Sequence, residues 1–198
     1  MVRRLQSACD PLEELARAVA ASLLGMARAV LSLALRRIAA MAVDWLIISC
    51  FAASLVPLGL LLVNRSVDLP PTAWNAAAFL LLIVPATLWL ARWEGATRAA
   101  SPGKRLLRLT VVTPGRPRLG WRRGLARNGL KIALPWELGH TAAFLVSNPT
   151  ASRSLVATGL ACAVISCLLA TTYVASLFVG TGRTPYDRAT RTRVSWAP

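Results

Sequence analysis

Four stretches of the chain are rich in apolar residues, and short polar segments separate them. They cover about residues 38–63, 73–91, 128–146 and 154–179. Each is close to the roughly 20 residues that an α-helix needs to cross a hydrocarbon core about 30 Å thick. The pattern therefore predicts an all-α integral membrane protein with four transmembrane helices.

The third stretch is less apolar than the others, and its crossing is predicted from charge. Lys131, Glu137 and His140 make it more polar than a lipid-facing span. Lys and Arg concentrate in the cytoplasmic segments of membrane proteins. Here they gather before the first stretch, between the second and third, and after the fourth, and only Arg65 and Arg153 remain for the other side. Both termini are therefore expected in the cytoplasm, which requires residues 128–146 to cross.

Residues 1–35 precede the first span and are expected to form an amphipathic helix in the membrane interface. Pro11 suits the first turn of a helix, and the two glutamates that follow it favour the N-terminal end. Arg17 and Arg28 interrupt the apolar pattern, as in helices that lie on a membrane surface. The alternative is an Ala/Arg-rich extension without stable structure.

The basic segment between the second and third stretches carries a turn signal. Residues 106–112 and 118–121 flank Thr113-Pro-Gly-Arg116, which has Pro and Gly at its central positions. Two short runs around such a turn are typical of a hairpin. We expect a short, basic, β-hairpin-like loop on the cytoplasmic face, with residues 36–195 forming one transmembrane domain.

Composition excludes several classes of protein. The 198 residues are 56% hydrophobic and carry a formal net charge of +15. The basic residues cluster between the apolar stretches, which is the arrangement of a membrane protein, and no nucleic-acid partner is expected. The four cysteines lack metal-ligand spacing, so we expect neither a metal nor a cofactor. With one histidine and no nucleophile–base pattern, we do not expect an enzyme.

The leading candidate for a functional site is Arg37 with Asp44. Asp44 lies seven residues, or roughly 10 Å, further along the first predicted span, on the same helix face. A charged Asp at the bilayer centre costs about 2.5–3.5 kcal/mol, so an intramembrane carboxylate suggests an ion or proton site. The alternative is structural, with Arg37 at lipid phosphates and Asp44 hydrogen-bonded to a neighbouring segment.

Two further groups of polar residues extend this hypothesis. Asp187 is expected near the cytoplasmic surface at the depth of Arg37, and we predict that the two form an ion pair. The alternatives are a helix cap or a solvated side chain. Glu137 and His140 share one helix face and would extend a polar path from Asp44, or they would merely satisfy each other.

A basic patch is expected to contact anionic lipid headgroups. Ser101-Pro-Gly-Lys104 lacks the spaced glycines of a phosphate-binding loop, so nucleotide binding is not expected. Each basic residue near an anionic membrane contributes about 1 kcal/mol. The alternative is a solvated loop. The residues of this patch are Lys104, Arg105, Arg108, Arg122, Arg123 and Arg127.

Three separated motifs resemble those of the RDD family of small bacterial membrane proteins, and the resemblance covers about residues 36–195. The motifs are Arg37-Ile-Ala-Ala-Met-Ala-Val-Asp44, Ser101-Pro-Gly-Lys-Arg105 and Tyr186-Asp187 through Thr192-Arg193-Val194. Ser101, Tyr186 and Arg191 depart from the family's usual Thr, His and Gly.

The resemblance implies that Arg37, Asp44 and Asp187 are signature residues of a multi-pass protein of the bacterial plasma membrane. It also implies a transport role, since some relatives are associated with exchange of monovalent cations and protons. We therefore expect a small transporter of that kind in the lipid bilayer, assembled as a homo-oligomer because four helices enclose little space. The alternative is a non-transporting accessory or scaffold protein.

Overall fold

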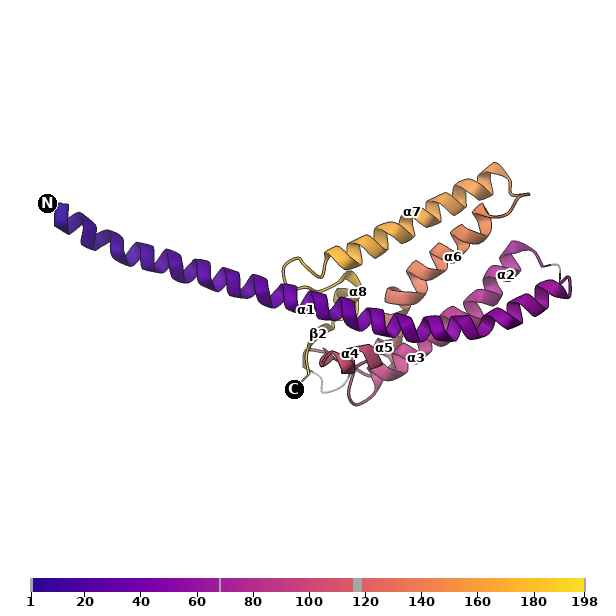
Figure 1. The fold of residues 1–198 in the computed structure, drawn as a ribbon, viewed down its shortest axis with the longest axis horizontal. Helices are drawn as coiled ribbons and strands as arrows, with labels where there is room; N and C mark the ends of the chain where they lie inside the picture. Colours follow the sequence, from indigo (N-terminus) through magenta and orange to yellow (C-terminus); the bar gives the residue numbers. More distant parts are fainter. Residues whose placement is uncertain (1, 68, 116–118, 198) are drawn as a thin grey trace.

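The computed structural model describes residues 2–67, 69–115 and 119–197, and it is mostly helical (Figure 1). For residues 2–13 and 16 only the backbone is described. In chain order the elements are α1 (Val2–Asn64), α2 (Pro71–Ala78), η1 (Phe79–Ile83), α3 (Val84–Gly95), α4 (Pro102–Leu106), β1 (Leu109–Val112), α5 (Trp121–Asn128), η2 (Gly129–Ala133), α6 (Leu134–Val146), α7 (Arg153–Ala175), α8 (Pro185–Ala189) and β2 (Arg193–Trp196).

Helix α1 joins the expected interfacial helix and the first span into one element of 63 residues. It begins well before Pro11, and no break separates residues 2–35 from the span. The sequence around Arg36 is built from Ala, Leu and Arg, which all favour helix, and nothing there interrupts the backbone hydrogen bonds. The first half of α1 runs on past the other helices (Figure 1). Contact of this half with the membrane interface stays a prediction.

Two π-helical turns interrupt the helices that follow, and each ends shortly before a proline. Segment η1 lies two residues before Pro85, and η2 lies two residues before Pro135. A proline inside a helix has no N–H to donate, and its ring crowds the carbonyl one turn back. A wider turn relieves this crowding and keeps the helix continuous.

Among the described residues, three helices are long and apolar enough to cross a membrane. Arg17–Asn64 and Pro71–Gly95 contain the first and second expected spans. Arg153–Ala175 covers most of the fourth, which was expected to run on to residue 179. The segment expected to be the third span is helical from Trp121 to Val146, and α6 packs against α7 and α2. Its crossing stays a prediction.

The expected hairpin is wrong, because β1 pairs with the C-terminal strand β2. The two strands are antiparallel, with Val111 opposite Val194. Both valines are buried with Ala40, Leu109 and Leu119. In Arg193–Trp196 the side chain of Val194 is buried and its neighbours are more exposed, so Val194 faces inward. Residues 119–120, in contrast, form no strand and lead into α5. Residues 116–118 lie outside the described part.

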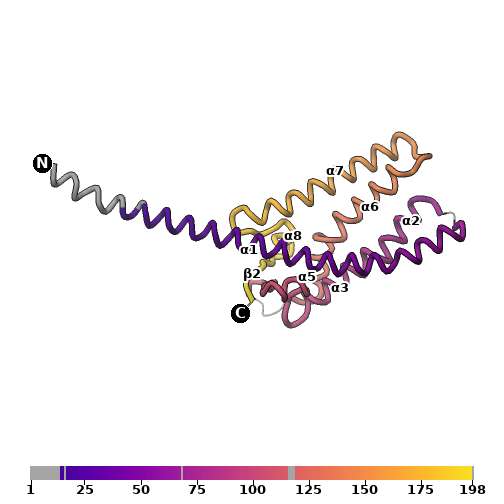
Figure 2. Tube along the Cα trace, in the orientation of Figure 1, coloured from indigo at the N-terminus to yellow at the C-terminus, as the bar shows by residue number. Residues whose placement is uncertain are grey.

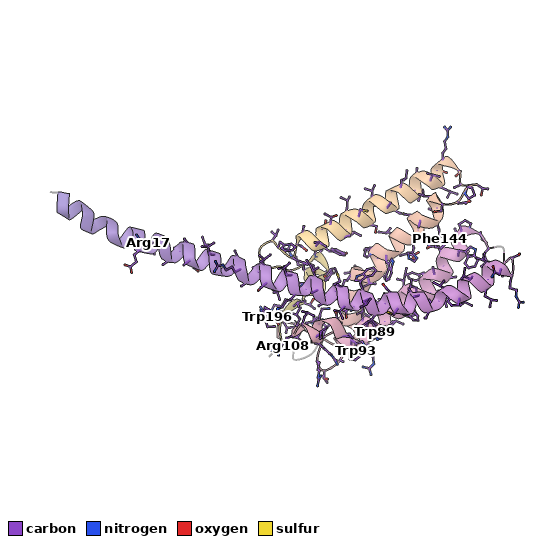
Figure 3. All side chains as sticks on the ribbon, viewed as in Figure 1. Arg17, Trp89, Trp93, Arg108, Phe144 and Trp196 are labelled. Carbon is purple, nitrogen blue, oxygen red and sulfur yellow. The ribbon has the colours of Figure 1, made fainter. Side chains whose placement is uncertain are left out.

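The C-terminal tail is thereby held beside the middle of α1 (Figure 2). The guanidinium of Arg36 lies 4.7 Å from the centre of the Trp196 ring. In Figure 3, Trp93, Arg108 and Trp196 lie toward one end of the helices and Phe144 toward the other. Side chains such as Leu46, Leu60 and Leu168 are exposed on the outer faces of α1 and α7. Lipid covers such side chains in a membrane protein.

Candidate functional site

Arg37, Asp44 and Asp187 lie where α3, α4, α5 and α8 approach the middle of α1. Arg37 and Asp44 lie on α1 and Asp187 on α8, and all three side chains are buried. Buried charges are stable in proteins only when ionic partners or hydrogen bonds compensate them. Each side chain here has such partners.

Asp187 accepts from two guanidinium groups. Arg37 Nη2 lies 2.6 Å from Asp187 Oδ2, which confirms the predicted ion pair, and Arg127 Nη2 lies 2.8 Å from Oδ1. Asp187 also completes a capping box with Thr184 at the start of α8, so the alternative role in a helix cap is present as well. Burial opposes ionisation of this carboxyl, but Arg127 and Arg37 outweigh it and hold its pKa well below the usual range.

The lowered pKa of Asp187 predicts how stability depends on pH. A carboxyl with a depressed folded-state pKa stabilises the fold above its unfolded-state value of 3.8, and this contribution is lost as the pH falls below it. We expect Asp187→Asn to lower the unfolding temperature at pH 7, and the gap from the parent protein to narrow below pH 3.8. Thermal unfolding in detergent micelles from pH 7 to pH 2.5 measures this. A gap that stays constant with pH would contradict the ionised state of Asp187.

Glu94 at the end of α3 is a functional candidate that the sequence reasoning missed. Its side chain has no exposure to solvent. Lys104 Nζ lies 2.6 Å from its Oε1, and Arg127 Nη1 lies 2.5 Å from its Oε2. Asn128 Nδ2 donates to Oε2 at 3.0 Å. In the sequence, Glu94 is a lone carboxylate between an apolar span and a basic segment. That position could have indicated a partner for the basic residues.

Asp44 is held by the start of α4. Ser101 Oγ donates to Asp44 Oδ2 at 2.5 Å, and the backbone N–H of Gly103 donates to Oδ1 at 2.8 Å. Glycine is needed here, because a Cβ at position 103 would lie 2.0 Å from the carbonyl oxygen of Ala40. Asp44 is therefore hydrogen-bonded to a neighbouring segment, as in the structural alternative, and Arg37 contacts Asp187 instead of lipid phosphates.

These contacts form one continuous network, which we call the charge clasp. Lys104 Nζ donates to Ser101 Oγ at 3.2 Å, and this bond links the Asp44 contacts to Glu94. The clasp holds three cations and three carboxylates, so its formal charges balance. Removing one member of a buried pair leaves its partner uncompensated, at a cost of about 3–5 kcal/mol. The charged members are Arg37, Lys104, Arg127, Asp44, Glu94 and Asp187.

The clasp corrects part of the expected lipid-headgroup patch. Lys104 and Arg127 are buried in ion pairs with Glu94, so they do not lie in an exposed basic patch as predicted. The prediction placed both residues on the surface from their charge alone. It missed Glu94 as a partner, and Asp187 lies far from Arg127 in the sequence. Arg108 and Arg122 are exposed, Arg123 is half-buried, and the guanidinium of Arg105 lies over the Trp93 ring at 4.2 Å. Headgroup contact by these four stays a prediction.

Glu137 and His140 lie apart from the clasp. Asn75 Nδ2 donates to Glu137 Oε1 at 2.8 Å and to Thr141 Oγ1 at 3.0 Å. Within the described residues, no hydrogen bond leads from this group to Asp44, so the expected polar path from Asp44 is not formed. His140 instead packs edge-on against Trp136 and Phe144.

We call Asn75, Glu137 and Thr141 the outer cluster. In the part of the chain that the structure describes, Asn75 Oδ1 and Glu137 Oε2 are buried without a hydrogen-bond partner. Burying a polar atom unpaired is costly unless a ligand or water satisfies it. The outer cluster therefore offers two free oxygen atoms to a ligand.

A cavity of about 290 Å³ lies between α1, α6 and α7, next to the clasp. Its polar end is cationic, and its walls are apolar and aromatic, including Trp45, Trp136, Tyr173 and Leu177. The cationic residues that line it are Arg37, Lys104, Arg127 and Lys131.

Comparison with known proteins matches these features to a family. A family model described as the RDD family matches residues 31–191, which is most of the chain. This chain belongs to the RDD family. The matched residues include Arg37, Asp44 and Asp187, and the match confirms the predicted family. No curated protein and no solved structure shows significant similarity to the chain.

Family membership and the apolar helices together establish an RDD-family membrane protein. The matched region also contains Glu94, Lys104 and Arg127. Arg37, Asp44 and Asp187 are therefore parts of one buried network that joins α1 to four other helices.

Proposed function

We propose that this RDD-family chain crosses the plasma membrane of a bacterium four times, with both ends in the cytoplasm. Two features support the fourth crossing. The connections between α1 and α2 and between α6 and α7 lie at the same end of the molecule (Figure 1). The basic segments lie at the other end of the spans, as the charge rule for cytoplasmic segments requires.

Within this topology we propose a small, non-enzymatic transporter that exchanges monovalent cations and protons, with Glu137 as the ion-binding carboxylate. Asp44, Glu94 and Asp187 are engaged in the charge clasp. The observation that carries the proposal is the buried, unpartnered Oε2 of Glu137 beside the unpartnered Oδ1 of Asn75. Hard cations prefer oxygen ligands. A carboxylate with a free oxygen accepts either a proton or a small cation, which is the alternation that exchange requires.

The test is proton flux driven by a cation gradient in vesicles that contain the purified protein. We expect Glu137→Gln to lower this flux at least about tenfold, because a group that carries the ion in the membrane cannot be replaced by a neutral amide. Glu14→Gln is the matched control, since it makes the same change at an exposed position of α1. Parent-level flux in Glu137→Gln would rule out the assigned role of Glu137.

The second candidate is a non-transporting accessory or scaffold protein. The charge clasp favours it, because Arg37 and Asp187 form an ion pair and Asp44 is hydrogen-bonded to Ser101 and Gly103, as in a structural role. The same vesicles separate the two functions. If the parent protein moves neither protons nor Na⁺ or K⁺, the scaffold function replaces transport. Assembly as a homo-oligomer is part of either proposal.

A further inference from the structure

Lys131 is a surplus buried cation beside a balanced network. The ion pairs of the clasp join Arg37, Lys104 and Arg127 to Glu94 and Asp187, and Lys131 belongs to none of these pairs. Its side chain is 8% exposed, and within the described residues its Nζ has no hydrogen-bond partner or ion pair. Lys131 lines the mostly apolar cavity, and an ammonium group without a counter-ion is costly in such surroundings, so its position favours a bound anion.

The place for that anion is the cavity that Lys131 lines. Arg37, Lys104 and Arg127 line the same cavity, and among the described residues no carboxylate does. A ligand with a positive group would therefore meet only like charges there, whereas a phosphate would meet several donors. Lys and Arg are the residues that proteins use for such contacts.

The rest of the cavity suits an apolar chain. Met41 and Trp45 of α1 face Pro135 and Trp136 of α6, and their two indole rings are 4.6 Å apart. Residues of α7, including Ala170, form the remaining wall, and the outer faces of α1 and α7 are apolar and exposed. A free inorganic anion would gain nothing from these walls, whereas an acyl chain would bury apolar surface against them.

We propose that this cavity binds one anionic phospholipid, with its phosphate at Lys131 and the start of an acyl chain along Trp45 and Trp136. A volume of about 290 Å³ holds a headgroup phosphate and the first carbons of a chain, and the rest of the lipid lies along α1 and α7. This site is separate from the outer cluster and does not depend on the exchange proposed there.

The test is native mass spectrometry of the delipidated full chain, titrated with phosphatidylglycerol or with phosphatidylcholine. We expect one phosphatidylglycerol to bind more tightly than phosphatidylcholine. Lys131→Met should weaken phosphatidylglycerol binding about fivefold, the factor that one basic residue near an anionic membrane supplies, and should reduce its advantage over phosphatidylcholine, whose positive choline group no longer meets that charge. Lys131 takes no part in the clasp, so this change leaves the ion pairs intact.

Three control variants test where the lipid binds. Arg122→Met removes an exposed charge of the same sign and should leave the bound lipid in place. Ala170→Trp fills the apolar wall and should weaken both lipids, which tests the site without touching a charge. Glu137→Gln should not change lipid binding, and this separates the site from the proposed transport.

Four results would overturn the proposal. The first is equal affinity for the two lipids, and the second is parent-like affinity in Lys131→Met. The third is a loss in Arg122→Met equal to that in Lys131→Met, which would assign the lipid to the surface patch. The fourth is displacement of the lipid by millimolar inorganic phosphate, which would assign the cavity to a free anion.

Discussion

Arg127→Met should be the most destabilising single charge substitution in the clasp. Arg127 is 1% exposed and contacts both Glu94 and Asp187, so its loss leaves two buried carboxylates short of a partner. Breaking one buried pair costs about 3–5 kcal/mol, which lowers the unfolding temperature of a chain of this size by roughly 6–20 °C. Thermal unfolding of the purified protein in micelles measures the shift.

Arg123→Met is the matched control for this change. Arg123 lies on the same helix and is half-buried, and within the described residues it makes no ion pair. We expect its substitution to change the unfolding temperature by a few degrees at most. Equal shifts for Arg123→Met and Arg127→Met would mean that general charge loss, and not the clasp, sets the stability.

Gly103→Ala should destabilise the protein by a different route. The added Cβ would lie 2.0 Å from the Ala40 carbonyl oxygen, so α4 must move away from α1. Overpacking costs about 1–3 kcal/mol, and a weakened hydrogen bond to the charged Asp44 adds about 1.5–3 kcal/mol. The measurement is the unfolding temperature in micelles.

The control for the glycine substitution is Gly129→Ala. Gly129 is helical, and a Cβ there meets nothing within 4 Å. Ala favours helix over Gly, so this variant should match or exceed the stability of the parent protein. If Gly103→Ala is as stable as Gly129→Ala, then α4 does not approach α1 as closely as described.

The sequence predicts the parts of the fold that follow from local patterns. Hydropathy placed three helices that the structure contains, and the depth of Asp187 and Arg37 along their segments predicted their ion pair. Both inferences use only the rise of a helix and the thickness of a membrane. Membership of the RDD family was likewise readable from three short motifs.

The features that the sequence did not predict depend on contacts between distant segments. The partner of β1 lies more than 80 residues further along the chain, and a nearer turn signal favoured a local hairpin. Burial of Lys104 and Arg127 depends on Glu94, and nothing local shows that these three side chains converge. The continuous α1 was missed because two arginines suggested a boundary, although neither residue interrupts a helix.

The most direct test of the charge clasp is the unfolding temperature of the double variant Arg127→Met with Asp187→Asn, compared with the two single variants. Either single substitution already breaks the ion pair between these side chains, so their effects should not add. The account predicts that the double variant loses less unfolding temperature than the sum of the two single losses. Losses that add in full would mean that the two side chains are not coupled, which would contradict it.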